Sequence, residues 1–396
     1  MSVMEITKME ITKMEITKPE ITKAINTATE ILKAGLPDFT HMFKEETSLN
    51  NYYFPAENIE WTPGFLTGQY WLAWELTRDD AFKDAALVQV DSFDNRIKKK
   101  IGVAHHDMGF LYSLSCIAAW RLVGSTVGRD AAIMAADQLM TRFHKVGNFI
   151  QAWGEIGAKA NYRLIIDCLL NLPLLYWATQ ETRDEKYRTV ARLHTQTALK
   201  NLVRPDFSTY HTFFFDPETG EPDRGVTAQG YKNSSPWARG QAWGIYGTAI
   251  AYLYTKDPAC MDMFYGVTDF FIKRLESGCK DMVPYWDLIF DDKHGQPKDS
   301  SSAAIACCGM LEMAKHLPKD KAAYYTSIAR KIAGSLARDY AAESDKSNGL
   351  LLHGVYNKQS PYNARADWGV DECTLWGDYF WLELLTRLSM DWKIYW

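Results

Sequence analysis

Two aspartates in the sequence stand where a carboxyl group can take part in acid–base chemistry. Asp167 lies in the apolar segment RLIIDCLLNLPLLYWA, which we expect to form a buried helix. An ionised carboxylate is costly in apolar surroundings, so burial favours the protonated form that a general acid needs. A carboxylate satisfied by an interhelical hydrogen bond would fit the same pattern. From its position alone, Asp167 is therefore a candidate for catalysis or for packing.

Asp107 follows two histidines in AHHDMGFLYSL, at the expected start of another helix. The simplest role for an acidic residue at this place is to cap the helix or to complement its dipole. His105 and His106 raise the further question of a metal site. Adjacent side chains diverge, however, and no HxxxH or HxxE spacing supplies more ligands. We therefore predict no metal ion.

Tryptophans near expected helix starts favour a carbohydrate ligand. Trp61 precedes one such helix, and Trp237 and Trp243 flank Arg239 in SPWARGQAW. Indole rings pack against the C–H face of a pyranose, while carboxylates and amides bind its hydroxyl groups. Arg239 is suited to a substrate carboxylate because its planar guanidinium matches two oxygens. Core packing is the alternative role, and we assign it to Trp381 and to most other aromatic residues.

Composition and missing motifs exclude several classes of protein. There is no GxSxG, no Walker loop and no dinucleotide fingerprint, so serine-nucleophile, phosphoryl-transfer and hydride chemistry have no support. A net charge of −5 with a single short lysine run argues against a nucleic-acid partner. The odd number of cysteines, seven, favours reduced thiols. Without a long apolar run or a signal-peptide core, we expect no membrane partner and a cytoplasmic location.

The elements that would position these residues are paired helices. Long apolar helices follow polar or glycine-containing starts near Gly64, His106, Tyr162, Trp237, Ser300 and Asp371. Amphipathic segments follow five of them, at 81–98, 129–145, 183–201, 258–276 and 320–340. The sixth inner helix, 372–388, pairs with an amphipathic helix near 24–46. Six pairs predict an all-α protein, an (α/α)6 barrel, with its chemistry at the end where the inner helices begin.

Shorter features complete the predicted architecture. Strand-like periods at 211–215, 285–290 and 350–356 predict β-hairpins inserted over the active-site end. No linker divides the chain, so we expect one catalytic domain over 24–396. Residues 1–23 precede it as an extension that carries MEITK three times and PEITK once. We expect this extension to be peripheral, with an oligomer contact as the alternative.

Four motifs in this order, HHDMGF, RLIIDCLLNLPLLYWA, SPWARGQAWGIYG and CTLWGDYFW, resemble the unsaturated glucuronyl hydrolases of glycoside hydrolase family 88. The resemblance covers residues 61–381. It implies an (α/α)6 barrel that uses no metal or organic cofactor. The implied substrates are glycosaminoglycan disaccharides and short oligosaccharides whose non-reducing end is a Δ4,5-unsaturated glucuronate left by a lyase.

The resemblance also implies a role for each candidate residue. Asp167 would be the general acid and base, which protonates C4 and activates a water that adds at C5. The resulting hemiketal rearranges and releases the neighbouring sugar. Asp107 would hold ring hydroxyls and support the charge on Asp167. The expected substrate contacts are His106, His211 and Gln229 near the unsaturated ring, Arg239 near the uronate carboxylate, and Trp61, Trp237 and Trp243 as walls.

One departure bears on the leaving sugar. Family members that prefer sulfated fragments resemble one another in an arginine near the position of Ala228 and in a downstream loop with serine and lysine. Ala228 cannot bind sulfate, although Lys358 and Ser360, or Arg224, are further candidates. We therefore expect unsulfated or mildly sulfated chondroitin and hyaluronan disaccharides as substrates. Separately, we expect the protein to be a monomer or a homodimer.

Three other functions stay open at this point. An unsaturated rhamnogalacturonyl hydrolase would share the barrel and the hydration chemistry. A sugar epimerase would shuttle protons with histidines, for which His105, His106, His211 and His353 are available. A non-catalytic glycan-binding toroid would use the same aromatic residues without turnover.

Overall fold

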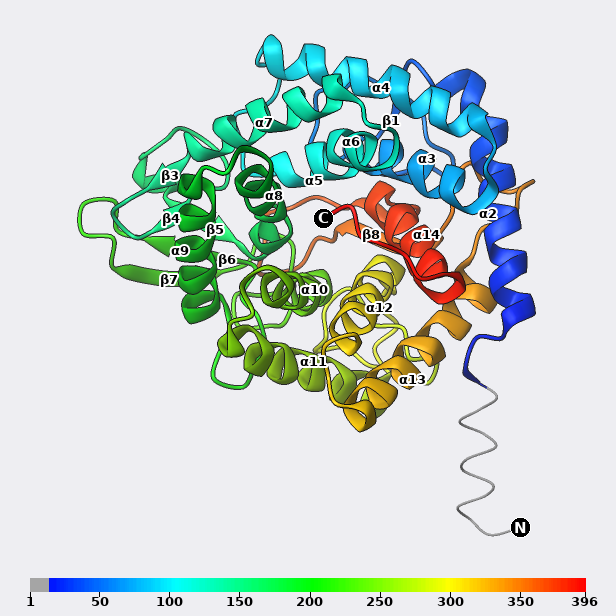
Figure 1. Cartoon of the computed structure of the whole chain (residues 1–396). Coiled ribbons are helices and arrows are strands. Elements are labelled where there is room, and N and C mark those ends of the chain that lie inside the picture. The colour runs from blue at the N-terminus through cyan, green and yellow to red at the C-terminus, as the bar shows by residue number, and fades with distance from the viewer. Residues whose placement is uncertain (1–13) are drawn as a thin grey trace.

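Helices in two concentric rings form the body of the molecule (Figure 1), which a computed structural model describes over residues 14–396. The inner ring comprises α3 (Pro63–Thr77), α5 (Met108–Tyr112) with η1 (Ser113–Ile117) and α6 (Ala118–Val123), η3 (Ile166–Leu170) with α8 (Pro173–Thr182), α10 (Ala238–Thr255), α12 (Ser300–Ala314) and α14 (Leu375–Ser389). The outer ring comprises α2 (Lys18–Phe39), α4 (Asp80–Lys98), α7 (Thr126–Met140), α9 (Glu185–Leu202), α11 (Pro258–Gly278) and α13 (Lys319–Ser335) with η4 (Leu336–Tyr340). These pairs confirm the predicted (α/α)6 barrel.

Burial explains why the rings differ in sequence. Every residue of α10 from Ala238 to Ala251 is buried, as expected for a helix that is apolar nearly all round. In α4, by contrast, buried residues such as Phe82 and Phe93 alternate with exposed ones, so a single face meets the inner ring. Each large apolar side chain buried in this way contributes roughly 1.5–3 kcal/mol.

Two glycines allow the inner helices to approach closely at the end where they begin. A Cβ atom on Gly64 of α3 would lie 2.1 Å from the main-chain oxygen of Phe110 on α5. A Cβ atom on Gly109 would lie 2.4 Å from the Cα of Asn171, just after η3. Since no side chain fits at such distances, glycine is needed at both places. The contact draws the segments that carry Asp107 and Asp167 together.

Short antiparallel strands lie over this end of the barrel. They form the pairs β1 (Phe43–Lys44) with β2 (Pro55–Ala56), β3 (Phe143–His144) with β4 (Phe149–Ile150), and β8 (Gly354–Asn357) with β9 (Trp368–Glu372), together with the three-stranded sheet β5 (Arg163–Ile165), β6 (Thr212–Phe215) and β7 (Pro222–Val226). β6 lies in the predicted strand segment 211–215, and β8 overlaps the end of the segment 350–356. The third, 285–290, contributes only isolated bridges, Tyr285 to Lys298 and Asp287 to Trp237. There the Asp287 carboxylate turns inward and accepts hydrogen bonds from Tyr231 and Ser235.

The prediction of one continuous helix over the segment RLIIDCLLNLPLLYWA, residues 163–178, is wrong. The chain instead forms strand β5, then the 3-10 helix η3, and only from Pro173 the α-helix α8. β5 pairs with β6, with Arg163 opposite Phe214 and Ile165 opposite Thr212. A short apolar run that is buried in either form cannot distinguish a strand from a helix by periodicity. Asp167 therefore lies on a tight turn between strand and helix.

The N-terminal helix also differs from its predicted bounds. α2 begins at Lys18, because Thr17 and Glu20 form a reciprocal capping box, and it ends at Phe39 instead of near residue 46. Ile16 is buried and its main chain bonds to Arg330 of α13. Residues 1–13, which hold most of the repeat, lie outside the described residues. The division into an extension and a catalytic domain stays a prediction.

The C-terminal residues turn back into the middle of the ring (Figure 1). The Trp396 indole stacks on Phe380 with ring centroids 5.9 Å apart, and its Nε1–H donates to Glu383. All seven cysteines are free and buried. Among residues 14–396, no helix has the length and apolar character needed to cross a bilayer.

Candidate active site

A cavity of about 540 Å³ opens where the inner helices begin. Two of its lining residues, Asp107 and Trp237, are the N-cap residues directly before α5 and α10. The cavity also brings together most of the other predicted site residues, namely Trp61, Asp167, His211, Gln229, Arg239 and Trp243. His106 lies just beneath it, in contact with both aspartates.

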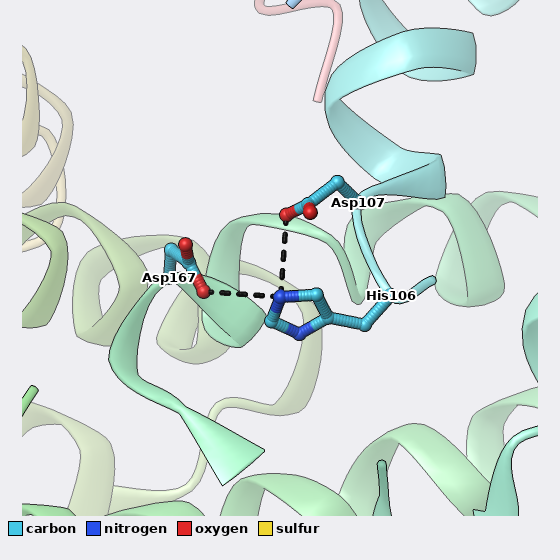
Figure 2. Close-up of side chains that lie close together, drawn as sticks. All are labelled: His106, Asp107 and Asp167. Carbon is cyan, nitrogen blue, oxygen red and sulfur yellow. Dashed lines mark ion pairs between the residues drawn. The ribbon is translucent and has the colours of Figure 1, made fainter. Parts of the chain in front are cut away.

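Asp107 and Asp167 both lie close to one nitrogen of the His106 ring (Figure 2). The Nε2 atom of His106 is 3.3 Å from Asp107 Oδ1 and 3.5 Å from Asp167 Oδ1. The Asp107 side chain is 3% exposed and that of Asp167 is 18% exposed, so Asp167 is the more open of the two carboxyl groups toward the cavity. The two acids, 60 positions apart in the sequence, thus share one buried neighbour.

Burial makes both carboxyl groups weak acids. It raises the pKa of Asp107 to about 7, although hydrogen bonds from Asn171 and Trp153 act in the opposite direction. Burial and then the charge of Asp107 raise the pKa of Asp167 well above its usual value, while Arg239 acts in the opposite direction. Two neighbouring carboxylates cannot both ionise cheaply. The pair therefore holds a proton near neutral pH that it can give to a substrate.

His106 is a neutral neighbour of these acids. Burial and then the nearby positive charges lower its pKa well below the usual value. A neutral imidazole carries one N–H, which at Nε2 can be donated to either carboxylate. His105 diverges from it, as predicted for adjacent side chains. It stacks on Trp153 at 4.3 Å, and its Nδ1 accepts the Asp107 main-chain N–H at 3.1 Å, so its role is to position the chain.

Asn171 positions Asp107 and was missed as a functional candidate. Its Oδ1 accepts the main-chain N–H of Phe110 at 2.9 Å, and its Nδ2 donates to Asp107 Oδ1 at 3.2 Å. The first bond fixes the orientation of the amide, so the second must present a donor to the carboxylate. In the sequence Asn171 shows only as a polar residue in an apolar segment.

Arg239 is buried at the side of the cavity and is held from several directions. Its guanidinium lies between the rings of Trp237 and Trp376, at 4.5 and 4.6 Å from their centroids. It donates to the main-chain oxygen of Val355 and to Gln229 Oε1, and lies 3.6 Å from Asp299. Trp243, the other predicted flank of Arg239, lines the cavity instead. Few donors of Arg239 stay free, so what it offers to the cavity is its charge and the amide of Gln229 that it holds.

His211 offers a neutral hydrogen-bond donor to the cavity. Its Nδ1 accepts the main-chain N–H of Ala228 at 2.8 Å, so in the neutral ring the proton is on Nε2. Burial, followed by the charges of Arg239, Arg365 and Arg163, lowers its pKa to about 3. It therefore stays neutral at any physiological pH.

Aromatic rings form much of the remaining wall. Trp61 stacks on Trp376 at 5.1 Å and its Nε1–H donates to the Tyr356 hydroxyl at 3.0 Å. Several lining residues were not predicted, among them Trp153, Arg163, Tyr356 and Arg365. They lie in loops and strands, where no helical periodicity marks them.

Among residues 14–396, one group of side chains has a spacing that suits three ligands of a metal ion. It consists of His106, Asp107 and Asp167, whose ligand atoms lie within 4.8 Å of one another. An acid with a pKa of about 7 is protonated in part at neutral pH, and a metal ligand must be deprotonated. The absence of a metal stays a prediction.

A family model with the description Glycosyl Hydrolase Family 88 matches residues 38–377. The chain belongs to glycosyl hydrolase family 88. It is 47% identical to the unsaturated chondroitin disaccharide hydrolase of Streptococcus pneumoniae, over 94% of this chain and 93% of that protein. It is therefore a glycosidase, which decides against the epimerase and the non-catalytic toroid.

Solved structures in the family have the same architecture. The unsaturated glucuronyl hydrolase of Streptococcus agalactiae matches with a TM-score of 0.92 and 47% identity, over 96% of this chain and 95% of that chain. A variant of the same enzyme complexed with dGlcA-GalNAc6S matches with a TM-score of 0.84 and 43% identity, over 96% of this chain and 94% of that chain. The identity extends over nearly the whole barrel, so the cavity lies in a shared scaffold.

Proposed function

We propose that this family 88 glycosidase removes the Δ4,5-unsaturated glucuronate from the non-reducing end of lyase-generated glycosaminoglycan oligosaccharides. The observation that carries the proposal is the proton-holding Asp107 and Asp167 pair on the floor of an aromatic cavity. The names of the relatives support this substrate class, because they are hydrolases of unsaturated chondroitin disaccharides or of unsaturated glucuronyl groups. None of those names concerns rhamnogalacturonan.

The reaction begins with a proton transfer from Asp167 to C4 of the C4=C5 double bond. Positive charge then develops at C5 and the ring oxygen, and the nearby negative charge of Asp107 stabilises it. A water molecule adds to C5 and gives its proton to Asp167, which restores the starting protonation state. The product is a hemiketal, whose ring opens so that the bond to the leaving sugar breaks. Carboxylate-spacing rules for acetal hydrolysis do not apply to such a hydration.

Neighbouring side chains orient the substrate for this proton transfer. The charge of Arg239, with the amide of Gln229 that it holds, suits the uronate carboxylate. The Nε2–H of His211 suits a ring hydroxyl or the carboxylate. Trp61, Trp237 and Trp243 offer flat apolar faces for the sugar ring. The ring is flattened at its double bond, because C4 and C5 are trigonal in the substrate.

The test is loss of the ultraviolet absorbance of the double bond when the protein is mixed with unsaturated disaccharides. Chondroitin, hyaluronan, heparin and rhamnogalacturonan disaccharides are compared at equal concentration. We expect loss with chondroitin and hyaluronan substrates. Loss with rhamnogalacturonan alone would support the rival hydrolase, and no loss with a folded protein would reject hydration chemistry altogether.

A further inference from the structure

The Trp153 indole lines the cavity, although it lies on an irregular loop, residues 151–158. It stacks on His105 with ring centroids 4.3 Å apart, and its side chain forms a hydrogen bond with Asp107. The residues that follow it, 154–157, are exposed. An exposed loop is mobile unless other contacts hold it. The position of this indole beside a reacting carboxyl group therefore depends on what holds the loop.

Arg142 joins this loop to the segment that leads into α5. It follows α7 in the chain and is buried. Its Nε donates to the main-chain oxygen of Gln151 at 2.8 Å and its Nη2 to that of Gly154 at 3.0 Å, on either side of Trp153. Its Nη1 donates to the main-chain oxygen of Ala104 at 2.9 Å. One planar guanidinium therefore fixes the two segments relative to each other.

The side chain of Gln151 holds the same loop a second time. It is buried, and its Nε2 donates to the main-chain oxygens of Glu155 at 2.8 Å and of Trp153 at 3.3 Å. Its Oε1 accepts the main-chain N–H of Gly157 at 2.9 Å and lies 2.9 Å from Nε2 of His144. The amide thus spans the exposed part of the loop and fixes its shape.

Arg142 carries a charge that these hydrogen bonds do not neutralise. Its three acceptors are main-chain oxygens, and within residues 14–396 no carboxylate forms an ion pair with it. Burial lowers the pKa of Arg142, and the charge of Asp107 acts in the opposite direction. A neutral donor could bond to such oxygens without the cost of a buried charge. This cost is offset when Asp107 is ionised, the state that stabilises positive charge at C5 in the proposed reaction.

We propose that Arg142 and Gln151 are positioning residues for the reaction, which hold the Trp153 indole in contact with Asp107. The proposal rests on the proposed function, which gives Asp107 its part in the reaction. Neither side chain lines the cavity, so each acts through the loop and not on the substrate. A displacement of about 1 Å can cost about a hundredfold in rate, so residues outside the cavity can control turnover.

The experiment is a double-mutant cycle on kcat and KM with an unsaturated chondroitin disaccharide. Arg142→Lys keeps the charge but cannot reach three oxygens at once. Trp153→Phe keeps an aromatic ring and removes the N–H donor. The free energy of unfolding by urea shows that each variant is folded. Arg204→Lys is the matched control, because the Arg204 guanidinium also holds main-chain oxygens of two segments, at Thr209 and Asn233.

We expect Arg142→Lys and Trp153→Phe each to lower kcat by about tenfold to a hundredfold and to change KM less. Because both changes break the same contact, the double variant should be about as slow as the slower single variant. Arg204→Lys combined with Trp153→Phe should give the product of the single effects, within about twofold. A product of single effects for Arg142→Lys too, or a wild-type kcat in folded Arg142→Lys, would overturn the positioning role.

Gln151→Asn repeats the test without changing a charge, so the proposal stays testable if Arg142→Lys does not fold. The shorter side chain cannot reach both the Glu155 oxygen and the Gly157 N–H. We expect its effect on kcat to be non-additive with that of Trp153→Phe, and additive effects would count against the proposal. An active wild type with additive variants rejects the positioning role alone, whereas a wild type that hydrates no unsaturated disaccharide rejects the proposed function itself.

Discussion

Two buried clusters of charge lie in the same barrel and differ in how completely they are paired. At the cavity floor, Asp167 Oδ1 and both ring nitrogens of His106 have no hydrogen-bond partner. Near the C-terminal end of α14, Arg387 pairs with Glu312 at 2.6 Å and with Glu383 at 2.9 Å. The Tyr246 hydroxyl donates to Glu383 and accepts from Arg387.

The difference separates a structural cluster from a reactive one. The Arg387 cluster contains its own counterions, and the charge of Arg387 is the main factor that lowers the pKa of Glu312 despite burial. The cavity cluster has two acids, a neutral imidazole and no paired cation, so burial raises the pKa of both acids. Buried groups that are left unpaired are costly and mark the place where a ligand completes the arrangement. The cavity cluster is therefore the one suited to proton transfer.

Asp167→Asn should produce the largest effect, a loss of turnover of about 10²–10⁴-fold. The substitution keeps the shape of the side chain and removes the proton that C4 receives. Unsaturated disaccharide should still bind, as measured by quenching of tryptophan fluorescence. Asp378→Asn is the control, since Asp378 is buried but accepts the main-chain N–H groups of Leu350 and Leu351 away from the cavity. Near-normal turnover in folded Asp167→Asn would remove the cavity cluster from the mechanism.

Arg387→Met should lower stability and leave chemistry intact. Removing the cation leaves the buried Glu383 without a charge partner and Glu312 with Lys315 alone, which costs about 3–5 kcal/mol. The free energy of unfolding by urea measures the loss. Arg129→Met removes a surface pair with Glu181 and should cost less than about 1 kcal/mol. A variant as stable as wild type would mean that the Arg387 cluster is no better paired than the cavity floor.

The sequence predicts residues of the cavity cluster but none of the Arg387 cluster, and it predicts the contacts within neither. The sequence predicts the ring of helix pairs from the apolar faces of the helices. It predicts the aromatic cavity from the tryptophans near the helix starts. The approach of Asp107 to Asp167 does not follow from local pattern, because it depends on the close contact of Gly109 with Asn171. Arg163 was hidden for another reason: a strand within an apolar run was predicted as helix. The network around Arg387 joins α10, α12 and α14, so it too needs the tertiary structure.

Asp107→Asn should change how the stability of the protein depends on pH, apart from its effect on turnover. An acid with a higher pKa in the folded state holds its proton more tightly when folded. The stability that this acid contributes to the folded protein is complete below the unfolded pKa of about 3.9. It is lost as the pH rises to about 7. The variant should therefore gain stability over wild type between those values. At exposed Asp184, where the Lys186 main-chain N–H lowers the pKa, Asp184→Asn should show the opposite sign. The free energies of unfolding by urea of wild type and Asp107→Asn are compared at each pH. A difference that stays constant across this range would contradict the raised pKa of Asp107.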